Sequence, residues 1–242
     1  MRAMDKLKVI ETDTYITLEN THVLSTEEML ELVNFEISEQ LLNHYDNITI
    51  LVHSKFPEQV EKILRQRGFY LHDETLFVHK DLQQEELIGD SNLTFSSLHH
   101  VSTDIFKEAW GEVMSGSLNA PSTLHMNEQM MAVKKELGEA YKQSCLIASE
   151  NGNTIGVVMP HIEPGTTNEG RLFYFGLVPS ERGIGKSRKL HQSALSMLQR
   201  DFKARYYIGS TSVHNKPMVN TFVSNGCEIT ESYKVYKHIR GH

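Results

Sequence analysis

Residues Leu172 to Leu190 read LFYFGLVPSERGIGKSRKL, and this stretch decides the fold. An apolar run ends at Val178-Pro179, a glycine loop follows from Arg182 to Ser187, and a helical apolar pattern begins at Leu190. Glycines let the backbone approach a ligand closely, and the first N–H groups of a helix have no partners inside it. A strand, a glycine turn and a helix start therefore predict an anion site, held by backbone amides and favoured by the helix dipole.

Two common phosphate motifs do not fit this loop. The ending Gly185-Lys186-Ser187 is typical of a nucleoside-triphosphate loop, but that motif needs a glycine where Ser180 stands. The dinucleotide fingerprint G-x-G-x-x-G fits at Gly183 and Gly185 and fails at Arg188. An ordinary turn between a strand and a helix is the simpler alternative, and magnesium-dependent nucleotide binding is the least favoured one.

The loop Arg182-Gly183-Ile184-Gly185-Lys186-Ser187 resembles the coenzyme A loop of the GCN5-related N-acetyltransferases, usually written Arg/Gln-x-x-Gly-x-Gly/Ala. Arg182 and Gly185 match that pattern, and Ser187 stands where the family usually has Gly or Ala. The preceding Val178-Pro179 closes an apolar run, as expected for the strand before the loop. This resemblance extends over residues 92–242.

A second and weaker match lies near the C-terminus. The family often shows Asn-x-x-Ala-x-x-x-Tyr-x-x-x-Gly-Phe, and the stretch from Asn215 to Cys227 follows this spacing. Met218 replaces the Ala, Phe222 replaces the Tyr and Cys227 replaces the Phe. The motif supports the resemblance because it follows the glycine loop in the expected order.

The resemblance implies an α/β fold, a mixed sheet flanked by helices of the acyl-CoA N-acyltransferase type at 92–242. A smaller αβ domain is predicted to precede it at 1–85, and the polar, acidic stretch 81–91 is the candidate linker. In this first part, the order strand, short helix, Gly, strand repeats an order found again at 205–238. It is interpreted either as a degenerate half-domain of the same fold without a glycine loop, or as a common αβ arrangement of independent origin.

Local patterns place several elements. A helix starts at Ser25 and carries apolar residues on one face as far as Leu42, a strand covers Asn47 to His53, and Pro57 opens a further helix. Another helix is expected from about Glu128 to Lys142. The turn Glu150-Asn151-Gly152-Asn153 predicts a hairpin between two strands.

Composition limits the class of protein. The chain has 242 residues, a net charge of −7 and two distant cysteines. The negative charge argues against a general nucleic-acid binder, and two distant cysteines suggest neither a disulfide framework nor a zinc site. No apolar signal-peptide core and no run of membrane-spanning length is visible, so we expect a cytoplasmic protein without a membrane partner. A strand edge allows a homodimer but does not require one.

The resemblance implies acetyl-coenzyme A as co-substrate and direct acetyl transfer to a primary amine of a small molecule or protein. The strand edge at Leu177 and Val178 is implied to bind the pantetheine arm and polarise the thioester carbonyl, with Asn215 and the following helix, including Phe222, beside the cofactor. The backbone amides implied to hold the pyrophosphate are those of Arg182, Gly183, Ile184, Gly185, Lys186 and Ser187. The acceptor groove is expected to involve the loops 115–123 and 164–168.

The proton donor is less clearly indicated, because Phe222 stands where many members of the family have an acidic Tyr. Tyr233, Tyr236 or Tyr174 is a candidate replacement, although each is equally compatible with packing. Water is a second alternative, since a thiolate is a tolerable leaving group. The third alternative is a module that binds coenzyme A with weak or no catalysis.

Glu163, Glu169 and His161 are the candidates for the general base. His161 and Glu163 share one face of an expected strand, which suits an acid–base pair or a metal pair, and also plain surface residues. Among these residues we select Glu163 as catalytic and expect no metal. The adjacent pair His99-His100 lacks ligand spacing.

Overall fold

The computed structural model describes residues 2–119 and 124–241. The chain forms two compact units, one of Met1–Leu76 with Glu231–His242 and one of Phe77–Thr230. Two long strands, β4 (Tyr70–Asp81) and β10 (Glu228–Ile239), contribute residues to both units. The division therefore falls inside strands, and the end of the chain belongs with its beginning. From the sequence, a linker is expected at 81–91 and the whole of 92–242 is expected in the second domain, whereas the structure places 77–91 in the second unit and 231–242 in the first.

The first unit contains one edge of the sheet and a set of short helices. Its strands follow the order β1-β2-β3-β10-β4, in which β2 and β3 are parallel and the pairs β1/β2 and β3/β10 are antiparallel. Alternate residues of β3 are buried, as expected for a strand with one face on a core. The other elements are β1 (Lys8–Glu11), β2 (Tyr15–Glu19), α1 (Thr26–Glu31), α2 (Glu39–His44), β3 (Asn47–His53) and α3 (Glu58–Gln66).

The helical stretch of the first unit is broken where the sequence pattern predicts one helix. Ser25 caps α1 in a capping box with Glu28, as expected. A π-helical turn, Leu32–Glu36, follows, and Ser38 then caps α2 by accepting a hydrogen bond from the Leu41 N–H. The apolar spacing is kept across the break, so the pattern alone does not reveal it.

The second unit holds the rest of the sheet, in the order β4-β9-β8-β7-β6-β5. Helix α5 ends at Leu137 rather than near Lys142, because Gly138 opens a separate turn. The predicted hairpin connects β6 and β7. The elements of this unit are β5 (Leu93–Ser97), α4 (Thr103–Met114), α5 (Met126–Leu137), α6 (Tyr141–Ser144), β6 (Leu146–Glu150), β7 (Asn153–Ile162), β8 (Glu169–Leu177), α7 (Lys186–Arg200), β9 (Tyr206–Ser212) and α8 (Lys216–Ser224).

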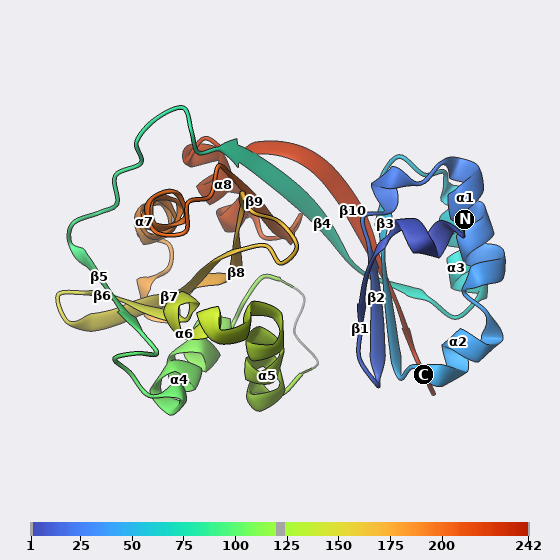
Figure 1. Cartoon of the computed structure of the whole chain (residues 1–242), viewed down its shortest axis with the longest axis horizontal. Helices are drawn as coiled ribbons and strands as arrows, with labels where there is room; N and C mark the ends of the chain where they lie inside the picture. The colour runs from blue at the N-terminus through green and yellow to red at the C-terminus, as the bar shows by residue number, and fades with distance from the viewer. Residues whose placement is uncertain (1, 120–123, 242) are drawn as a thin grey trace. The chain divides into compact units, whose positions relative to one another are not determined.

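Helices cover both faces of this part of the sheet (Figure 1). Helices α4 and α5 pack on one face, where Trp110 and Val133 meet Val157 and Met159 of β7. Helix α7 packs on the other face through a row that includes Leu190. Among the described residues, no helix combines the length and the apolar character needed to cross a membrane.

The polar stretch 82–90 is attached to α7 rather than acting as a free linker. The Leu87 N–H donates to Gln199 Oε1 at 2.9 Å, and Ser196 Oγ donates to the Leu87 carbonyl at 2.6 Å. The Asp90 N–H donates to Ser193 Oγ at 2.9 Å. These hydrogen-bond partners in α7 lie more than one hundred residues further along the chain than the stretch itself. The composition of the stretch is typical of a linker, but in the structure it is bound along α7.

His191 sets a limit on the acid stability of the second unit. Its side chain is fully buried in α7, in contact with the rings of Phe175, Tyr207 and Phe222. Burial lowers the pKa of His191 from 6.5 to about 3, because the charged imidazole is poorly solvated there. As pH falls, the unfolded chain therefore binds a proton that the folded chain does not.

We expect this stabilising contribution to be complete above the ordinary histidine pKa and to be lost as the pH falls from about 6.5 towards 3. The slope attributable to His191 is about 1.4 kcal/mol per pH unit in that window. Urea unfolding of the wild type and His191→Leu at several pH values tests this. Between pH 6.5 and 3, the free energy of unfolding of the variant should change less steeply with pH than that of the wild type, by the slope that corresponds to one proton. The exposed His100→Leu should keep the wild-type slope, and equal slopes for all three proteins would contradict the prediction.

Candidate functional site

A cavity of about 640 Å³ opens in the second unit between β8 and β9. These parallel strands pair only at Glu169↔Tyr206 and Gly170↔Tyr207. Beyond this point they line two walls of the cavity. The lining residues include Arg171 to Leu177 of β8, Tyr207 to Thr211 of β9, Arg182, Gly183 and Ser187 of the loop, and Asn215, Thr221 and Phe222 at and within α8.

The glycine loop leads from this cavity into α7. Gly183 and Gly185 have φ of +78° and +82°, a left-handed conformation that side chains with a Cβ adopt at a cost. Gly185 is the residue before the helix, so α7 starts at Lys186 directly after it. The N–H groups of the first helical turn have no carbonyl partner within the helix. The predicted strand, glycine turn and helix start are therefore all present.

Arg182 fixes the loop through its side chain. Its guanidinium donates to the carbonyls of Leu177 at 3.0 Å, Gly116 at 3.1 Å and Val113 at 2.7 Å. Its own backbone N–H donates to the Pro179 carbonyl at 3.3 Å. The Arg182 amide is therefore engaged inside the turn, and the amides left for an anion begin at Gly183.

Lys186 is held by two carboxylates. Its ammonium lies 2.6 Å from Glu150 Oε2 and 2.5 Å from Glu181 Oε2, and these partners raise the pKa of Lys186. The lysine of a nucleoside-triphosphate loop must reach the phosphates. A lysine with two acidic partners is poorly placed for that task, which argues further against the nucleotide alternative.

The backbone N–H groups of Leu177 and Val178 lie on opposite edges of β8. The Val178 N–H donates to the Ile155 carbonyl at 3.0 Å, so it is directed at β7 and is not free for a ligand. Peptide groups alternate in direction along a strand. The Leu177 N–H therefore lies on the opposite edge, where β8 has separated from β9, and Leu177 lines the cavity.

Asn119 connects the segment after α4 to the far wall of the cavity. Its Oδ1 accepts hydrogen bonds from Thr211 Oγ1 at 2.9 Å, the Ser212 N–H at 3.3 Å and Asn215 Nδ2 at 3.0 Å. Asn215 also caps α8 by accepting from the Met218 N–H. The sequence analysis did not single out Asn119 beyond including it in the loop 115–123, of which residues 120–123 lie outside the described residues.

A polar network lies at the closed end of the β8/β9 split. Arg171 Nε is 2.6 Å from Glu169 Oε1 and 3.4 Å from Glu163 Oε2, and the Tyr206 hydroxyl donates to Glu169 at 3.2 Å. His161 Nε2 is 3.7 Å from Glu163 Oε2. Since Arg171 also lines the cavity, it connects Glu163, the selected base, with the candidate site.

The candidate tyrosines divide between the two units. Tyr233 and Tyr236 lie in the first unit, where the Tyr233 hydroxyl donates to Glu231 and lies 2.7 Å from His22 Nδ1. The Tyr236 hydroxyl donates to Glu61 at 2.6 Å, and its ring belongs to the core of that unit. Neither is among the residues that line the cavity, and their catalytic role stays a prediction.

Tyr174 and Phe222 both line the cavity. Phe222 is buried against His191 and Tyr207, with no proton to donate. Tyr174 lies on β8 with its ring 5.5 Å from that of Trp110, and burial raises its pKa. Its hydroxyl is therefore protonated at neutral pH and is available as an acid.

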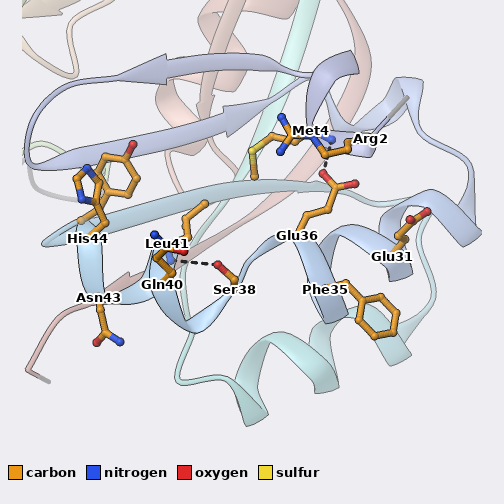
Figure 2. Close-up of a pocket in the computed structure, with 11 residues that line it drawn as sticks. Arg2, Met4, Glu31, Phe35, Glu36, Ser38, Gln40, Leu41, Asn43 and His44 are labelled. Carbon is orange, nitrogen blue, oxygen red and sulfur yellow. Dashed lines mark hydrogen bonds between the residues drawn. The ribbon is translucent and has the colours of Figure 1, made fainter.

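A second cavity, of about 1050 Å³, is open and belongs to the first unit (Figure 2). Its polar groups are largely committed to the fold. Glu36 accepts hydrogen bonds from the N–H groups of Ala3 and Met4, and Ser38 caps α2. No convergent set of groups indicates a ligand at this place.

Known proteins match this chain by structure and not by sequence. No protein-family model matches it, and no curated protein does. A GCN5-related N-acetyltransferase from Sphaerobacter thermophilus matches with a TM-score of 0.61 and 14% identity, over 96% of this chain and 75% of its own. A protein of unknown function from Staphylococcus epidermidis ATCC 12228 gives 0.63 and 11%, over 97% and 94%. A tandem GNAT protein from the clavulanic acid biosynthesis pathway gives 0.58 and 10%, over 98% and 79%.

At these identities the likeness establishes the fold. The chain has the α/β fold of the GCN5-related N-acetyltransferases, a mixed sheet flanked by helices, which confirms the fold class predicted from the sequence. Six of the ten predicted cofactor residues line the cavity: Leu177, Arg182, Gly183, Ser187, Asn215 and Phe222. Val178, Ile184, Gly185 and Lys186 are not among its lining residues, and for them a role toward the cofactor stays a prediction.

Proposed function

We propose that this protein is an N-acetyltransferase that transfers an acetyl group from acetyl-coenzyme A to a primary amine of a small molecule or protein. The observation that carries this proposal is the cavity between the separated strands β8 and β9, with a glycine turn and the start of α7 at its edge. This combination offers an anion site beside an unpaired strand edge. Phosphates and an amide-rich arm are the two parts of coenzyme A that such features bind.

Different groups of the chain would bind the different parts of acetyl-coenzyme A. The amides from Gly183 to Ser187 would hold the pyrophosphate, because they face no helical carbonyl and the helix dipole favours negative charge. The Leu177 N–H would bind the pantetheine arm and polarise the thioester carbonyl as negative charge develops on its oxygen. Asn215 and Phe222 would flank the arm from α8, where both line the cavity.

The proposed reaction is a direct transfer. The amine nitrogen attacks the thioester carbonyl carbon, a C–N bond forms, and the C–S bond then breaks. One proton leaves the amine to a base, and the departing thiolate gains one from an acid. Glu163 is our candidate base. It is not among the residues that line the cavity, and its Oε2 lies 3.4 Å from Nε of Arg171, which does line it.

Three tyrosines are candidates for the acid, and Tyr174 has the strongest support. It lines the cavity and keeps its proton at neutral pH. Tyr233 and Tyr236 remain alternative candidates from the sequence.

A catalytically weak or inactive coenzyme A-binding module is the second candidate function. Phe222 favours it, since a phenyl ring stands at the position where the family pattern has a tyrosine. This alternative predicts binding of acetyl-coenzyme A without turnover on any amine.

We also propose that the first unit is a degenerate half-domain of the same fold. The matched structures cover 96 to 98% of the chain, so the likeness includes residues before 77. This unit has the order β3, α3, β4 that the sequence repeat suggests, and its strand β3 pairs with β10.

Titration calorimetry of the full chain with acetyl-coenzyme A, and separately with magnesium-ATP, tests the proposal. We expect micromolar binding of acetyl-coenzyme A, no binding of magnesium-ATP, and free thiol release when a suitable amine is added. Binding without thiol release across a broad amine panel would favour the inactive module. If acetyl-coenzyme A does not bind, both the N-acetyltransferase and the inactive coenzyme A-binding module are ruled out, and the fold assignment is unaffected.

A further inference from the structure

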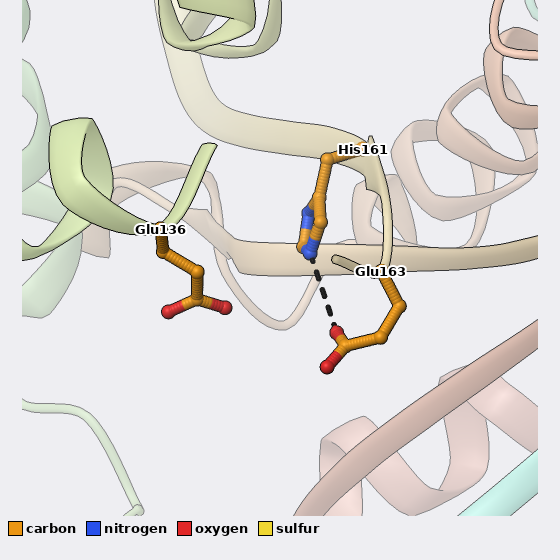
Figure 3. A group of neighbouring side chains, drawn as sticks. All are labelled: Glu136, His161 and Glu163. Carbon is orange, nitrogen blue, oxygen red and sulfur yellow. Dashed lines mark ion pairs between the residues drawn. The ribbon is translucent and has the colours of Figure 1, made fainter. Parts of the chain in front are cut away.

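Three ligand-type side chains from separate elements converge in the second unit. Glu136 belongs to α5, His161 to β7, and Glu163 follows directly after β7. One potential ligand atom of each lies within 4.8 Å of the others. Figure 3 shows the three side chains pointing into one space, with His161 between the two carboxylates.

The His161 ring is oriented as a metal ligand. The residue is 4% exposed, and its Nδ1 lies 3.4 Å from the Met159 carbonyl oxygen. A carbonyl only accepts hydrogen bonds, so a proton on Nδ1 would be directed at it, and in that tautomer Nε2 carries the lone pair that a metal ion requires. Nε2 is buried without a hydrogen-bond partner among the described residues. Histidines that bind metals commonly donate their second ring N–H to a carbonyl or carboxylate in this way.

Further charged groups lie around these three side chains. Glu136, Glu163 and Glu169 bring three carboxylates to this end of the sheet, and Arg171 pairs with the last two. His161 Nε2 faces Glu163 Oε2 at 3.7 Å, so a cation between the two atoms would be held by both.

We propose that Glu136, His161 and Glu163 bind a divalent transition-metal ion, of which zinc fits best. An imidazole with two carboxylates suits zinc better than calcium or magnesium, which prefer oxygen ligands only. Ligands of one tetrahedral zinc lie roughly 3.3 to 3.6 Å apart, given its bond lengths. The His161–Glu163 pair is already close to that separation, and the Glu136 side chain is exposed, with its ligand atom within 4.8 Å of the other two. Three protein ligands leave one position for water.

Such an ion would tie α5 to the turn between β7 and β8. It would raise the thermal stability of the chain increasingly as the free metal concentration exceeds the Kd, because only the folded chain assembles the three ligands. The proposal concerns metal binding alone and does not depend on acetyl transfer. With the ion bound, the Glu163 carboxylate would be a ligand and could not act as the general base, so the two proposed roles of Glu163 exclude each other.

Metal-stripped full-length protein titrated with Zn²⁺ against a chromophoric chelator tests the site. We expect one ion to bind at micromolar affinity or tighter and to raise the Tm by several degrees. Co²⁺ in place of Zn²⁺ should give the visible absorption of tetrahedral coordination. Glu136→Gln should weaken binding at least about tenfold, His161→Gln about a hundredfold, and Glu139→Gln, an exposed glutamate nearby on the same segment, should leave it unchanged.

Glu136→Gln keeps the test decisive if the buried His161→Gln variant fails to fold, because Glu136 is exposed. Circular dichroism verifies folding for each variant. If folded Glu136→Gln and Glu139→Gln bind Zn²⁺ equally and give the same Co²⁺ spectrum, the ion sits elsewhere and the proposal is wrong. Failure of the wild type to bind either ion would also overturn it, whatever the result with acetyl-coenzyme A.

Discussion

Gly185→Val is expected to weaken acetyl-coenzyme A binding by at least about 30-fold. A Cβ added at Gly185 meets no protein atom within 4 Å, so the new side chain would enter the open space beside the start of α7. In the proposed complex this space belongs to the pyrophosphate. Loss of one or two hydrogen bonds to a charged phosphate costs roughly 2 to 4 kcal/mol, and each 1.4 kcal/mol is a factor of ten in Kd.

The strain of the substitution must be separated from its effect on the ligand. Gly185 has φ of +82°, where valine is disfavoured. Gly152→Val is the matched control, because Gly152 has φ of +80°, also has open space around an added Cβ, and lies in the hairpin turn between β6 and β7, outside the glycine loop. Both variants should lose similar stability in urea, while only Gly185→Val loses affinity in calorimetry. Equal affinities for the two variants would remove the loop from the proposed cofactor site.

The glycine loop was predictable because its determinants are local. Val178-Pro179 ends the strand, Gly183 and Gly185 take the left-handed backbone, and α7 begins at the next residue. The same holds for the caps at Ser25 and for the β6/β7 hairpin. In each case a few adjacent residues specify the local backbone geometry, so a short sequence pattern is enough to predict it.

The cavity walls were not predictable in the same way. The separation of β8 from β9 depends on pairing between residues 37 positions apart, which ends after two residue pairs. Asn119 receives three hydrogen bonds from residues more than ninety positions away, and no spacing in the sequence signals them. The placement of residues 231–242 with the first unit likewise follows from the pairing of β10 with β3.

The sequence predicts that the strand edge at both Leu177 and Val178 binds the cofactor, but in the structure only Leu177 lies on the edge that faces the cavity. The sequence does not define which edge of β8 each N–H faces, and one residue more or less reverses the answer. The structure directs the Val178 N–H at Ile155 and leaves Leu177 on the other edge. Side chains that share a face, such as His161 and Glu163, are less sensitive, because their spacing of two is independent of the register.

Tyr174→Phe is expected to lower kcat by about a hundredfold and to leave the KM for acetyl-coenzyme A within about twofold, as for loss of a general acid. Tyr174 lines the cavity, and burial raises the pKa of its hydroxyl, which is therefore protonated at neutral pH. Its removal takes away a proton from the leaving thiolate and leaves the ring in contact with Trp110. Thiol release under saturating amine measures the effect, and calorimetry checks that cofactor binding is retained.

Comparison with other tyrosines makes this test specific. Tyr141→Phe removes a hydroxyl from a tyrosine that packs on the same hydrophobic cluster but does not line the cavity, so it should keep wild-type kcat. Tyr236→Phe removes the hydrogen bond to Glu61 and should lower stability by roughly 1 kcal/mol in urea. If Tyr233→Phe or Tyr236→Phe abolishes turnover in a folded protein while Tyr174→Phe does not, the acid comes from the first unit. If all of these variants turn over normally, water protonates the thiolate and no tyrosine is required, because a thiol of ordinary pKa leaves without a strong acid.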